Sequence, residues 1–257
     1  MLQLNNICTS FNKGTVDEMQ LFNNFNFNVD KGDFISIVGS NGSGKTTMLN
    51  IICGSLAPDS GKIIFNGKDF TNLTEYKRAK YIGRVFQDPK MGTCSNLTVL
   101  ENFALADNKN KRYNLTGAIS KKRIEYYKDL VKMCNMGLED RMNVKVGNLS
   151  GGQRQAIALV IAGMTDIDLL ILDEHTAALD PKSSETIMEI TDKIVRERNI
   201  TAVMVTHNLR FATEYGNRLV MMHGGNIIVD KKGEEKKKTG VEDLLGIFNE
   251  ISIECGN

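Results

Sequence analysis

A glycine-rich segment carries the clearest chemical signal in the sequence. Residues 39–46 read Gly-Ser-Asn-Gly-Ser-Gly-Lys-Thr, which fits the pattern G-x-x-x-x-G-K-[ST]. Glycines at this spacing let backbone N–H groups turn toward phosphate oxygens, and a helix that begins there adds unpaired N–H groups and a positive dipole end. The ammonium of Lys45 can reach the β- and γ-phosphates, and the hydroxyl of Thr46 can bind Mg²⁺. The segment therefore predicts a loop that holds the phosphates of a nucleotide.

Two carboxylates, Asp173 and Glu174, follow the apolar run Leu169–Leu172. At the end of a buried strand, Asp173 suits a direct or water-mediated contact with Mg²⁺. Glu174 can orient and polarise a water for in-line attack on a γ-phosphate. An acidic pair at a strand end can also be a solvated terminus. The phosphate-binding segment upstream favours the catalytic interpretation.

Several short apolar runs precede helix-like stretches, and these elements would position the chemical groups. The runs are apolar throughout rather than alternating, as expected for strands buried on both faces of a mostly parallel sheet. We therefore predict an α/β fold. The predicted strands are Phe34–Val38, Leu169–Leu172 and Thr201–Val205, and the predicted helices are Thr46–Cys53 and Pro181–Arg198.

Two regions depart from this alternation. Residues 60–70 contain Asn66-Gly67 between apolar segments, which predicts a β-hairpin. Residues 88–165 are mostly polar and helix-like, so we interpret them as an inserted helical lobe. On this division residues 1–87 and 166–257 form the core.

The C-terminal segment is charged before it becomes amphipathic. We interpret Lys236–Lys238 as part of a charged linker and residues 241–251 as a final amphipathic helix. The segment after Asp230 is too short for an additional regulatory domain, so we expect none there.

The composition excludes several classes of protein. The chain has 257 residues, 41% hydrophobic and 25% charged, as in ordinary globular proteins. Its formal net charge of +1 gives no general attraction to nucleic acid, and we expect no nucleic-acid partner. The five scattered cysteines fit a reducing compartment. No apolar run approaches the roughly 20 residues of a membrane-spanning helix, and the first residues show no secretory signal. If the protein acts on a membrane, we expect another chain to span it.

The segment Leu149-Ser-Gly-Gly-Gln153 points to a family. Together with the phosphate loop, the Asp173-Glu174 pair and the apolar run that ends at His207, it resembles the ATP-binding-cassette (ABC) ATPases. The resemblance covers essentially the whole chain. It implies a RecA-like P-loop core with an N-terminal antiparallel β portion and the inserted helical lobe. It also implies that the chain binds and hydrolyses ATP with Mg²⁺.

The same segment predicts that the ATP site is shared. Ser150-Gly-Gly opens a helix-like stretch over residues 154–162, so it offers a second helix N-terminus to an anion. One ATP already occupies the first loop. The second anion site therefore suggests closure over the γ-phosphate of a nucleotide on another copy, as happens in this family. We expect an ATP-dependent homodimer.

The resemblance assigns catalytic and metal-binding roles residue by residue. It implies that Glu174 and His207 are catalytic, with His207 touching the γ-phosphate. It implies that Thr46, Gln87 and Asp173 bind Mg²⁺, and that Gln87 also signals to a membrane partner.

The resemblance also implies a set of nucleotide-binding residues. Phe11 matches an N-terminal aromatic residue that stacks on adenine, and Phe22, Phe25 and Phe27 are the alternatives. Asp180 matches a loop that crosses the dimer interface. The full set is Phe11, Gly39, Ser40, Asn41, Gly42, Ser43, Gly44, Lys45, Thr46, Thr47, Gln87, Ser150, Gly151, Gly152, Gln153 and Asp180.

One position departs from the common pattern of the family. His175 follows Glu174 where the family usually has proline. It could perturb the proton balance of the neighbouring carboxylate, but we interpret it as the marker of a subgroup, with its side chain away from the phosphate. The strings RVFQDPKMGT and DEHTAALDP resemble bacterial import-system ATPases linked to the uptake of amino acids, aromatic ones included.

These resemblances imply a peripheral ATPase on the cytoplasmic face of a bacterial cell membrane. The implied partners are integral-membrane permease subunits and an extracellular solute-binding protein. The alternative is a soluble ABC ATPase of iron–sulfur cluster assembly, whose members have a similar length. DNA-repair members carry long coiled-coil or zinc-binding insertions, for which residues 88–165 are too short. A GTP-binding switch would need an Asn-Lys-x-Asp segment after the phosphate loop, and the sequence has none.

Overall fold

The computed structural model describes residues 1–109 and 117–254. The part of the predicted helical lobe that covers residues 110–116 lies outside the described residues. The chain divides into two compact units, and each is described by itself. The first unit comprises Met1–Ala79 and Thr201–Asn257, and the second comprises Lys80–Ile200.

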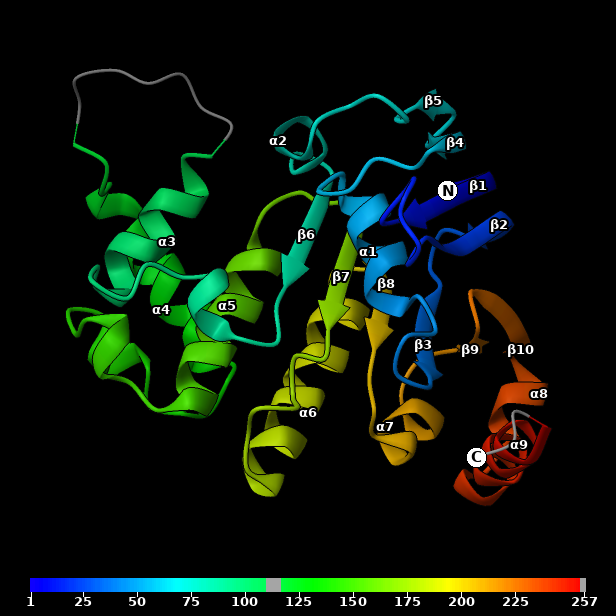
Figure 1. The fold of residues 1–257 in the computed structure, drawn as a ribbon. Helices are drawn as coiled ribbons and strands as arrows, with labels where there is room; N and C mark the ends of the chain where they lie inside the picture. The colour runs from blue at the N-terminus through cyan, green and yellow to red at the C-terminus, as the bar shows by residue number, and fades with distance from the viewer. Residues whose placement is uncertain (110–116, 255–257) are drawn as a thin grey trace. The chain divides into compact units, whose positions relative to one another are not determined.

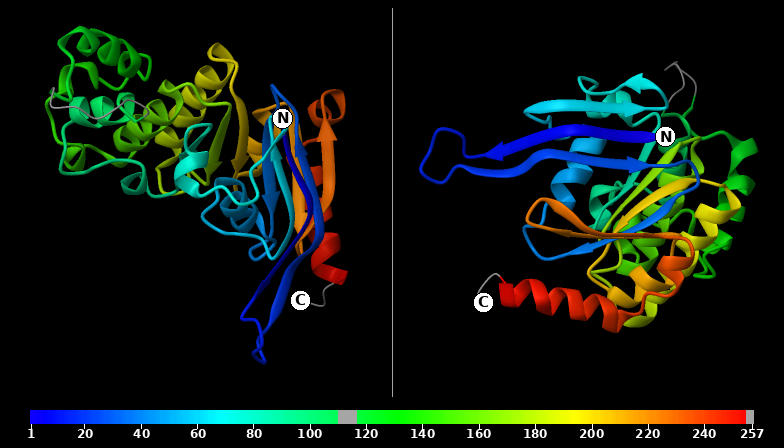
Figure 2. Two further views of the ribbon diagram at one scale, coloured as in Figure 1. Left: turned by 90° about the horizontal axis from the view of Figure 1, so that it is seen from above. Right: turned by 90° about the vertical axis from the view of Figure 1, so that its right-hand side faces the viewer.

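An antiparallel sheet with the strand order β2-β1-β4-β5 forms one layer of the first unit. At the start of β1 and at the end of β2, buried apolar side chains alternate with exposed ones, as expected for a sheet with one covered face. These two strands make a long ribbon whose tip extends beyond β4 and β5 (Figure 2). The strands are β1 (Leu2–Phe11), β2 (Met19–Val29), β4 (Ser60–Phe65) and β5 (Lys68–Asp69).

The predicted hairpin over residues 60–70 is confirmed by the pairing of β4 with β5. Asn66 and Gly67, which join the two strands, have φ angles of 48° and 75°. Both values lie in the left-handed region that a tight two-residue hairpin turn requires, and asparagine and glycine tolerate that region best.

A second sheet of the first unit carries the phosphate loop. In it β3 lies between β8 and β9 and runs parallel to both, and β10 pairs antiparallel with β9. All six residues of β3 are buried, as the continuous apolar run predicts. Helix α1 follows β3 along the chain (Figure 1). Leu244 of α9 packs in an apolar cluster that includes Leu219 and Met221. The elements are β3 (Phe34–Gly39), β8 (Thr201–Val205), β9 (Arg218–His223), β10 (Asn226–Lys232), α1 (Lys45–Cys53), α2 (Glu75–Arg78), α7 (Leu209–Glu214), α8 (Glu234–Lys237) and α9 (Val241–Glu254).

The interpretation of Lys236–Lys238 as a charged linker is wrong for its first two residues. They belong to the short helix α8, and Lys236 is only 3% exposed. Its ammonium donates to three backbone carbonyls, those of Thr213 at 2.9 Å, Tyr215 at 2.6 Å and Gly216 at 2.9 Å. A cation is favoured at the carboxyl end of a helix such as α7. These acceptors lie 20 to 23 residues away along the chain, so the sequence gives no local sign of them.

The second unit combines two parallel strands with a group of helices (Figure 1). Helices α3 and α4 contact α5, and α5 also contacts α6. A Cβ atom on Gly163 of α5 would lie 2.8 Å from the Ile194 side chain of α6, so glycine permits this close approach. The elements are β6 (Ile82–Val85), β7 (Leu169–Asp173), α3 (Val99–Asp107), α4 (Ile124–Lys132), α5 (Gly151–Met164) and α6 (Pro181–Glu197), with short 3-10 helices at Pro89–Met91, Lys121–Arg123, Glu139–Arg141 and Val146–Asn148.

The boundaries of the predicted core and lobe differ from those of the two compact units. Residues 88–165 lie inside the second unit, which also contains β6, β7 and α6 from the predicted core. The division into core and lobe therefore stays a prediction. Within the described residues, no helix combines the length and apolar character needed to cross a membrane.

Candidate functional site

The phosphate loop is shaped by glycines at positions where a side chain would collide. A Cβ atom on Gly39 would clash with the backbone oxygen of Met222 on β9. Gly44 has a φ of 100°, and a Cβ atom there would lie 2.8 Å from the Phe22 ring. The predicted helix begins one residue earlier than expected, at Lys45 rather than Thr46. The loop thus turns directly from the end of β3 into the N-terminus of α1.

Lys45 places its positive charge inside this loop. Its side chain is buried, and the ammonium donates to Gly39 O at 2.8 Å, Ser40 O at 2.9 Å and Ser43 Oγ at 3.4 Å. The next residue, Thr46, is exposed on the first turn of α1. A charge, a helix N-terminus and a hydroxyl therefore meet within one short segment, which is the arrangement that binds phosphate.

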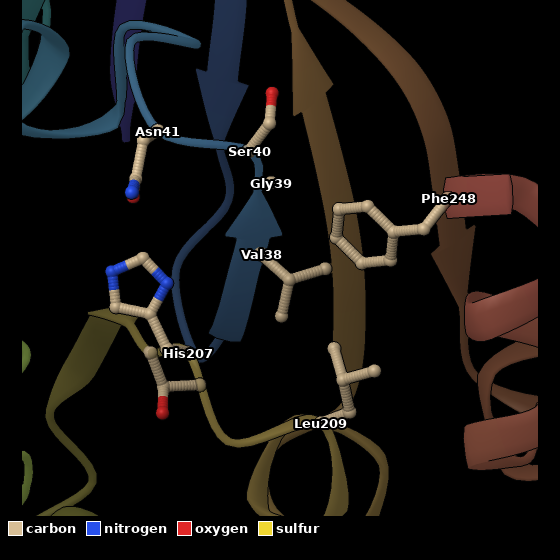
Figure 3. Close-up of a pocket in the computed structure, with 8 residues that line it drawn as sticks. Val38, Gly39, Ser40, Asn41, His207, Leu209 and Phe248 are labelled. Carbon is tan, nitrogen blue, oxygen red and sulfur yellow. The ribbon is translucent and has the colours of Figure 1, made fainter. Parts of the chain in front are cut away.

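A pocket of about 240 Å³ lies beside the loop in the first unit (Figure 3). His207, which follows β8, faces Asn41 across it. The Thr206 amide donates to Ile37 O of β3 at 3.1 Å, so the segment that carries His207 is tied to the strand that precedes the loop. The pocket is lined by Val38, Gly39, Ser40, Asn41, Thr206, His207, Leu209 and Phe248. The structure thus brings His207 next to the phosphate loop, 168 residues away along the chain from Gly39.

The first unit also separates the aromatic candidates for adenine stacking. Phe22, Phe25 and Phe27 are 0%, 6% and 3% exposed. Phe22 stacks on Phe25 with 4.5 Å between the ring centroids. They are core residues. Phe11, at the end of β1, is half-buried and is not among the residues of the His207 pocket. Its stacking role stays a prediction.

Asp173 ends β7 in the second unit, and Glu174 follows it. Asp173 accepts a hydrogen bond through Oδ2 from Arg84 Nη2 on the neighbouring strand β6, at 2.8 Å. Glu174 has a φ of 48°, in the left-handed region that a non-glycine residue seldom adopts. Such backbone conformations persist where the surrounding structure holds them, and they concentrate at functional sites.

His175, which follows Glu174 in the chain, is buried. Its Nε2 lies 3.0 Å from Thr191 Oγ1 on α6. The Thr191 hydroxyl donates to Ile187 O at 2.7 Å. Because that proton is used, the imidazole is the donor and carries a proton on Nε2. Burial lowers the pKa of His175 from 6.5 to about 4, which favours the neutral ring.

Ser150 begins α5 with a reciprocal hydrogen-bond pair. The Gln153 amide donates to Ser150 Oγ at 3.2 Å, and the Ser150 amide donates to Gln153 Oε1 at 3.2 Å. This capping box starts α5 at Gly151, three residues before the predicted position. A Cβ atom on Gly152 would lie 3.1 Å from Ser183 Oγ of α6, so this position is tight for any larger residue.

Gln87 and Asp180 lie on exposed segments of the same unit. Gln87 follows β6, and the preceding carbonyl, Phe86 O, accepts from Gln155 Nε2 of α5 at 3.0 Å. Asp180 caps α6, and hydrogen bonds from Ser183 lower the pKa of its carboxyl. The predicted residues thus fall into two sets. The first unit holds Phe11, Gly39–Thr47 and His207, and the second holds Gln87, Ser150–Gln153, Asp173, Glu174 and Asp180.

The predicted metal ligands are oxygen donors, the kind that Mg²⁺ prefers. Among the described residues there is no group of three or more His, Cys, Asp or Glu side chains that could hold a metal ion. Mg²⁺ usually keeps several waters and is bound by one or two carboxylates together with substrate phosphates. A single carboxylate, Asp173, with a hydroxyl and an amide fits that mode of binding.

Sequence reasoning missed Arg84 and His223. Arg84 interrupts the apolar run of β6, which is a signal that could have been used. His223 Nδ1 lies 3.1 Å from Ser40 Oγ of the phosphate loop. His223 ends β9, and nothing in the sequence near it indicates that it meets residue 40.

Comparisons with known proteins agree with this picture. The family model described as "ABC transporter" matches residues 22–177. A tyrosine transport ATP-binding protein of Clostridioides difficile is 46% identical over 96% of this chain and 98% of its own length. A phosphonates import ATP-binding protein of Fusobacterium nucleatum is 32% identical over 88% of this chain and 92% of its own.

Solved structures show the same fold. A dimeric ATP-binding cassette in a post-hydrolysis state, bound to ADP and Pi, superposes with a TM-score of 0.76 at 32% identity, covering 90% of this chain and 98% of that one. The ADP conformation of another cassette has a TM-score of 0.79 at 26% identity, covering 100% and 99%. The predicted α/β P-loop fold with an antiparallel sheet beside a parallel one is confirmed. The chain belongs to the ABC transporter family, as an ATP-hydrolysing cassette.

Proposed function

We propose that this chain drives a bacterial importer of amino acids, aromatic ones included, from the cytoplasmic face of the membrane. The observation that carries the proposal is the similarity along nearly the whole chain to a tyrosine transport ATP-binding protein. The import names of more distant relatives also favour transport over iron–sulfur cluster assembly, which remains the alternative.

The first unit supplies the groups that hold the nucleotide. Lys45 and the first N–H groups of α1 bind the β- and γ-phosphates, and Phe11 stacks on the adenine. His207 lies beside Asn41 at the loop, where it can donate a hydrogen bond to the γ-phosphate. These contacts neutralise phosphate charge and fix the γ-phosphate for in-line displacement.

The second unit supplies most of the groups that act on water and metal. Thr46 of the first unit, Gln87 and Asp173 would hold Mg²⁺. When bound, the ion would neutralise charge on the phosphate oxygens. Glu174 orients and polarises the attacking water. The burial of the next residue, His175, and the unusual φ of Glu174 support a fixed backbone position for the residue that carries this carboxylate.

A second copy of the chain completes the site in this proposal. Ser150, Gly151, Gly152 and Gln153 of one copy close over the γ-phosphate held by the other, and Asp180 lies on the loop that crosses the interface. The dimeric state of a related cassette bound to ADP and Pi supports this arrangement. ATP would therefore form part of the interface between the two copies, and its hydrolysis would let the copies separate.

An apolar surface of the second unit supports a permease partner. A second pocket of about 240 Å³ includes Met91 and Leu105, which are 68% and 55% exposed. Exposed apolar side chains that gather on one surface, as Met91 and Leu105 do around this pocket, are a feature of contact sites for other proteins. Within this surface, Met91 lies four residues beyond Gln87, the residue with the proposed signalling role. We assign this surface to an apolar segment of the permease that faces the cytoplasm.

Uptake measurements test the proposal. Cells that lack this chain should lose accumulation of labelled tyrosine, and the intact chain should restore it while Glu174→Gln should not. Leu105→Asp should keep the ATPase activity of the isolated protein and abolish restored uptake, because it damages only the permease contact. Normal amino-acid uptake without the chain, with loss of iron–sulfur enzyme activity instead, would overturn the proposal in favour of the alternative.

A further inference from the structure

One ion pair touches the proposed metal site and has no role in the mechanism above. Arg84 and Asp173 lie on adjacent parallel strands, where Arg84 of β6 pairs in register with Ile171 of β7. The Nη2–Oδ2 distance is 2.8 Å, and the two side chains are only 13% and 14% exposed. Screening by solvent is weak at such a site, so the pair is stronger than an ordinary surface salt bridge.

The surroundings of Arg84 hold its guanidinium in one place. The group lies over the Phe86 ring, 4.6 Å from the centroid. Its Nε atom is buried without a hydrogen-bond partner in the described part of the chain. Phe86 is itself fixed by the hydrogen bond from Gln155 to its carbonyl oxygen. The Arg84 guanidinium thus contacts Asp173 and the ring of Phe86, the residue that precedes Gln87.

This arrangement has an electrostatic consequence for the proposed Mg²⁺ ligand. The guanidinium already satisfies Oδ2 of Asp173 and places a positive charge within one hydrogen bond of it. A divalent cation at the same carboxylate must share or displace that contact, and the two cations repel each other. An isolated buried carboxylate would attract the metal more strongly, because metal binding would then relieve an uncompensated charge.

We propose that Arg84 is a positioning residue that acts as the resident counter-ion of Asp173 and weakens its hold on Mg²⁺. The carboxylate then remains compensated after the metal leaves, and the metal can leave with the products of each cycle. The inference rests on the proposed role of Asp173 in metal binding.

The test compares metal binding by charge variants of the full chain. Arg84→Met removes the charge and keeps an apolar stem of similar length, and Arg84→Lys keeps the charge. The matched control is Arg196→Met, which removes an exposed arginine of α6 that pairs with Asp192. Free Mn²⁺ is counted by electron paramagnetic resonance in the presence of ADP, and the Mg²⁺ dependence of ADP binding is measured by calorimetry.

We expect Arg84→Met to lower the half-saturating concentration of either ion by roughly threefold to tenfold, as one nearby charge in a partly solvated site should. Arg84→Lys and Arg196→Met should stay close to the parent protein. Arg84→Gln, which is also neutral, serves if the methionine variant does not fold. Unchanged or weaker metal binding in the neutral variants would refute the inference.

Asp173→Asn separates this inference from the function on which it rests. If this change leaves metal binding intact, the proposed role of Asp173 is wrong and the inference falls with it. If it weakens metal binding while the neutral Arg84 variants bind like the parent, only the counter-ion role is refuted.

Discussion

Two helix N-termini carry the proposed phosphate contacts, and they are built in opposite ways. Helix α1 begins after Gly44, in a backbone conformation with a φ of 100°, and this N-cap residue has no side chain with which to cap the helix. Helix α5 begins after Ser150, whose hydroxyl and amide are both engaged by Gln153 in a capping box. The first terminus therefore begins without a cap from its own N-cap side chain, whereas the second satisfies part of its own hydrogen-bonding capacity.

The same difference extends to the residues around each helix. In the first unit, Lys45 donates mainly to backbone carbonyls of its own loop. In the second unit, side chains hold one another, as in the pairs Arg84–Asp173 and His175–Thr191. Backbone geometry thus builds a receptor for phosphate, and side-chain contacts build the parts that act on it. Changes in the first set should impair nucleotide binding, and changes in the second should impair turnover.

The largest expected effect separates these two roles. Glu174→Gln keeps the shape of the side chain but cannot accept a proton, so hydrolysis should fall by about 10²–10⁴-fold. Nucleotide affinity should remain, because the first unit is untouched, and ATP should then hold two copies together. Phosphate release and equilibrium binding of ATP measure the two effects. Turnover like that of the parent would move the catalytic role elsewhere, with His207 as the first candidate.

A mixed dimer tests whether the two termini come from different copies. Lys45→Ala cannot hold phosphate at α1, and Ser150→Arg blocks the N-terminus of α5 by bulk, so each variant alone should be inactive. In a mixed dimer one site carries both changes, while the other pairs an intact Lys45 with an intact Ser150. Mixing the two inactive proteins should therefore restore ATPase activity, to at most half of the parent level.

The control for this experiment is each variant mixed with itself at the same total concentration. Full activity of Ser150→Arg alone, both in isolation and with its membrane partner, would refute the shared site. It would also remove α5 from the comparison, because its N-terminus would then have no part in the chemistry.

Features set by neighbours in the chain could be predicted from the sequence. The phosphate loop, the Asn66-Gly67 turn and the β7 run need only residues within one short window, and the structure has each of them. The motif at Ser150 also gave the start of a helix, although the capping box moves that start to Gly151.

Features set by distant neighbours could not be predicted. The burial of His175 against Thr191 has no local sign, because Thr191 lies 16 residues further on and offers no pattern. The Arg84–Asp173 pair joins residues 89 positions apart, and Lys236 is buried by carbonyls of α7 and the turn after it. In each case tertiary packing, and not local preference, decides the environment of a charged or polar group.

A smaller effect should appear in the dependence of stability on pH. Folding lowers the pKa of His175 to about 4, whereas in the unfolded chain it is near 6.5. Between these two pH values the His175 imidazole is protonated in the unfolded chain and neutral in the folded protein. The contribution of His175 is therefore complete above about pH 6.5 and is lost as the pH falls toward 4, by about 3 kcal/mol at most.

His175→Gln isolates that contribution, because an amide does not titrate and can still donate to Thr191. The free energy of unfolding, measured in urea without nucleotide, should fall more steeply for the parent than for the variant between pH 6.5 and pH 4. Carboxylates elsewhere change the stability of both proteins equally. If the free energy of unfolding falls with pH in parallel for the parent and the variant, the imidazole of His175 accepts a proton in the folded protein as readily as in the unfolded chain. The contact between His175 and Thr191 would then hold its side chains less rigidly than the comparison of the two units assumes.

The smallest expected effect asks what the capping box of α5 is for. Helix α3 carries a matching box in the same unit, in which Thr98 and Glu101 exchange the same two hydrogen bonds. Thr98 has no proposed contact with nucleotide. Replacing either N-cap residue by alanine should therefore lower the free energy of unfolding by about 1 kcal/mol. Only Ser150→Ala should also lower ATP turnover and ATP-dependent dimerisation, by a few-fold, because its hydroxyl serves both the helix and the phosphate. If both alanine variants lose the same stability and both keep the parent turnover, the Ser150 hydroxyl is only a cap, and the phosphate contacts of α5 come from its backbone alone.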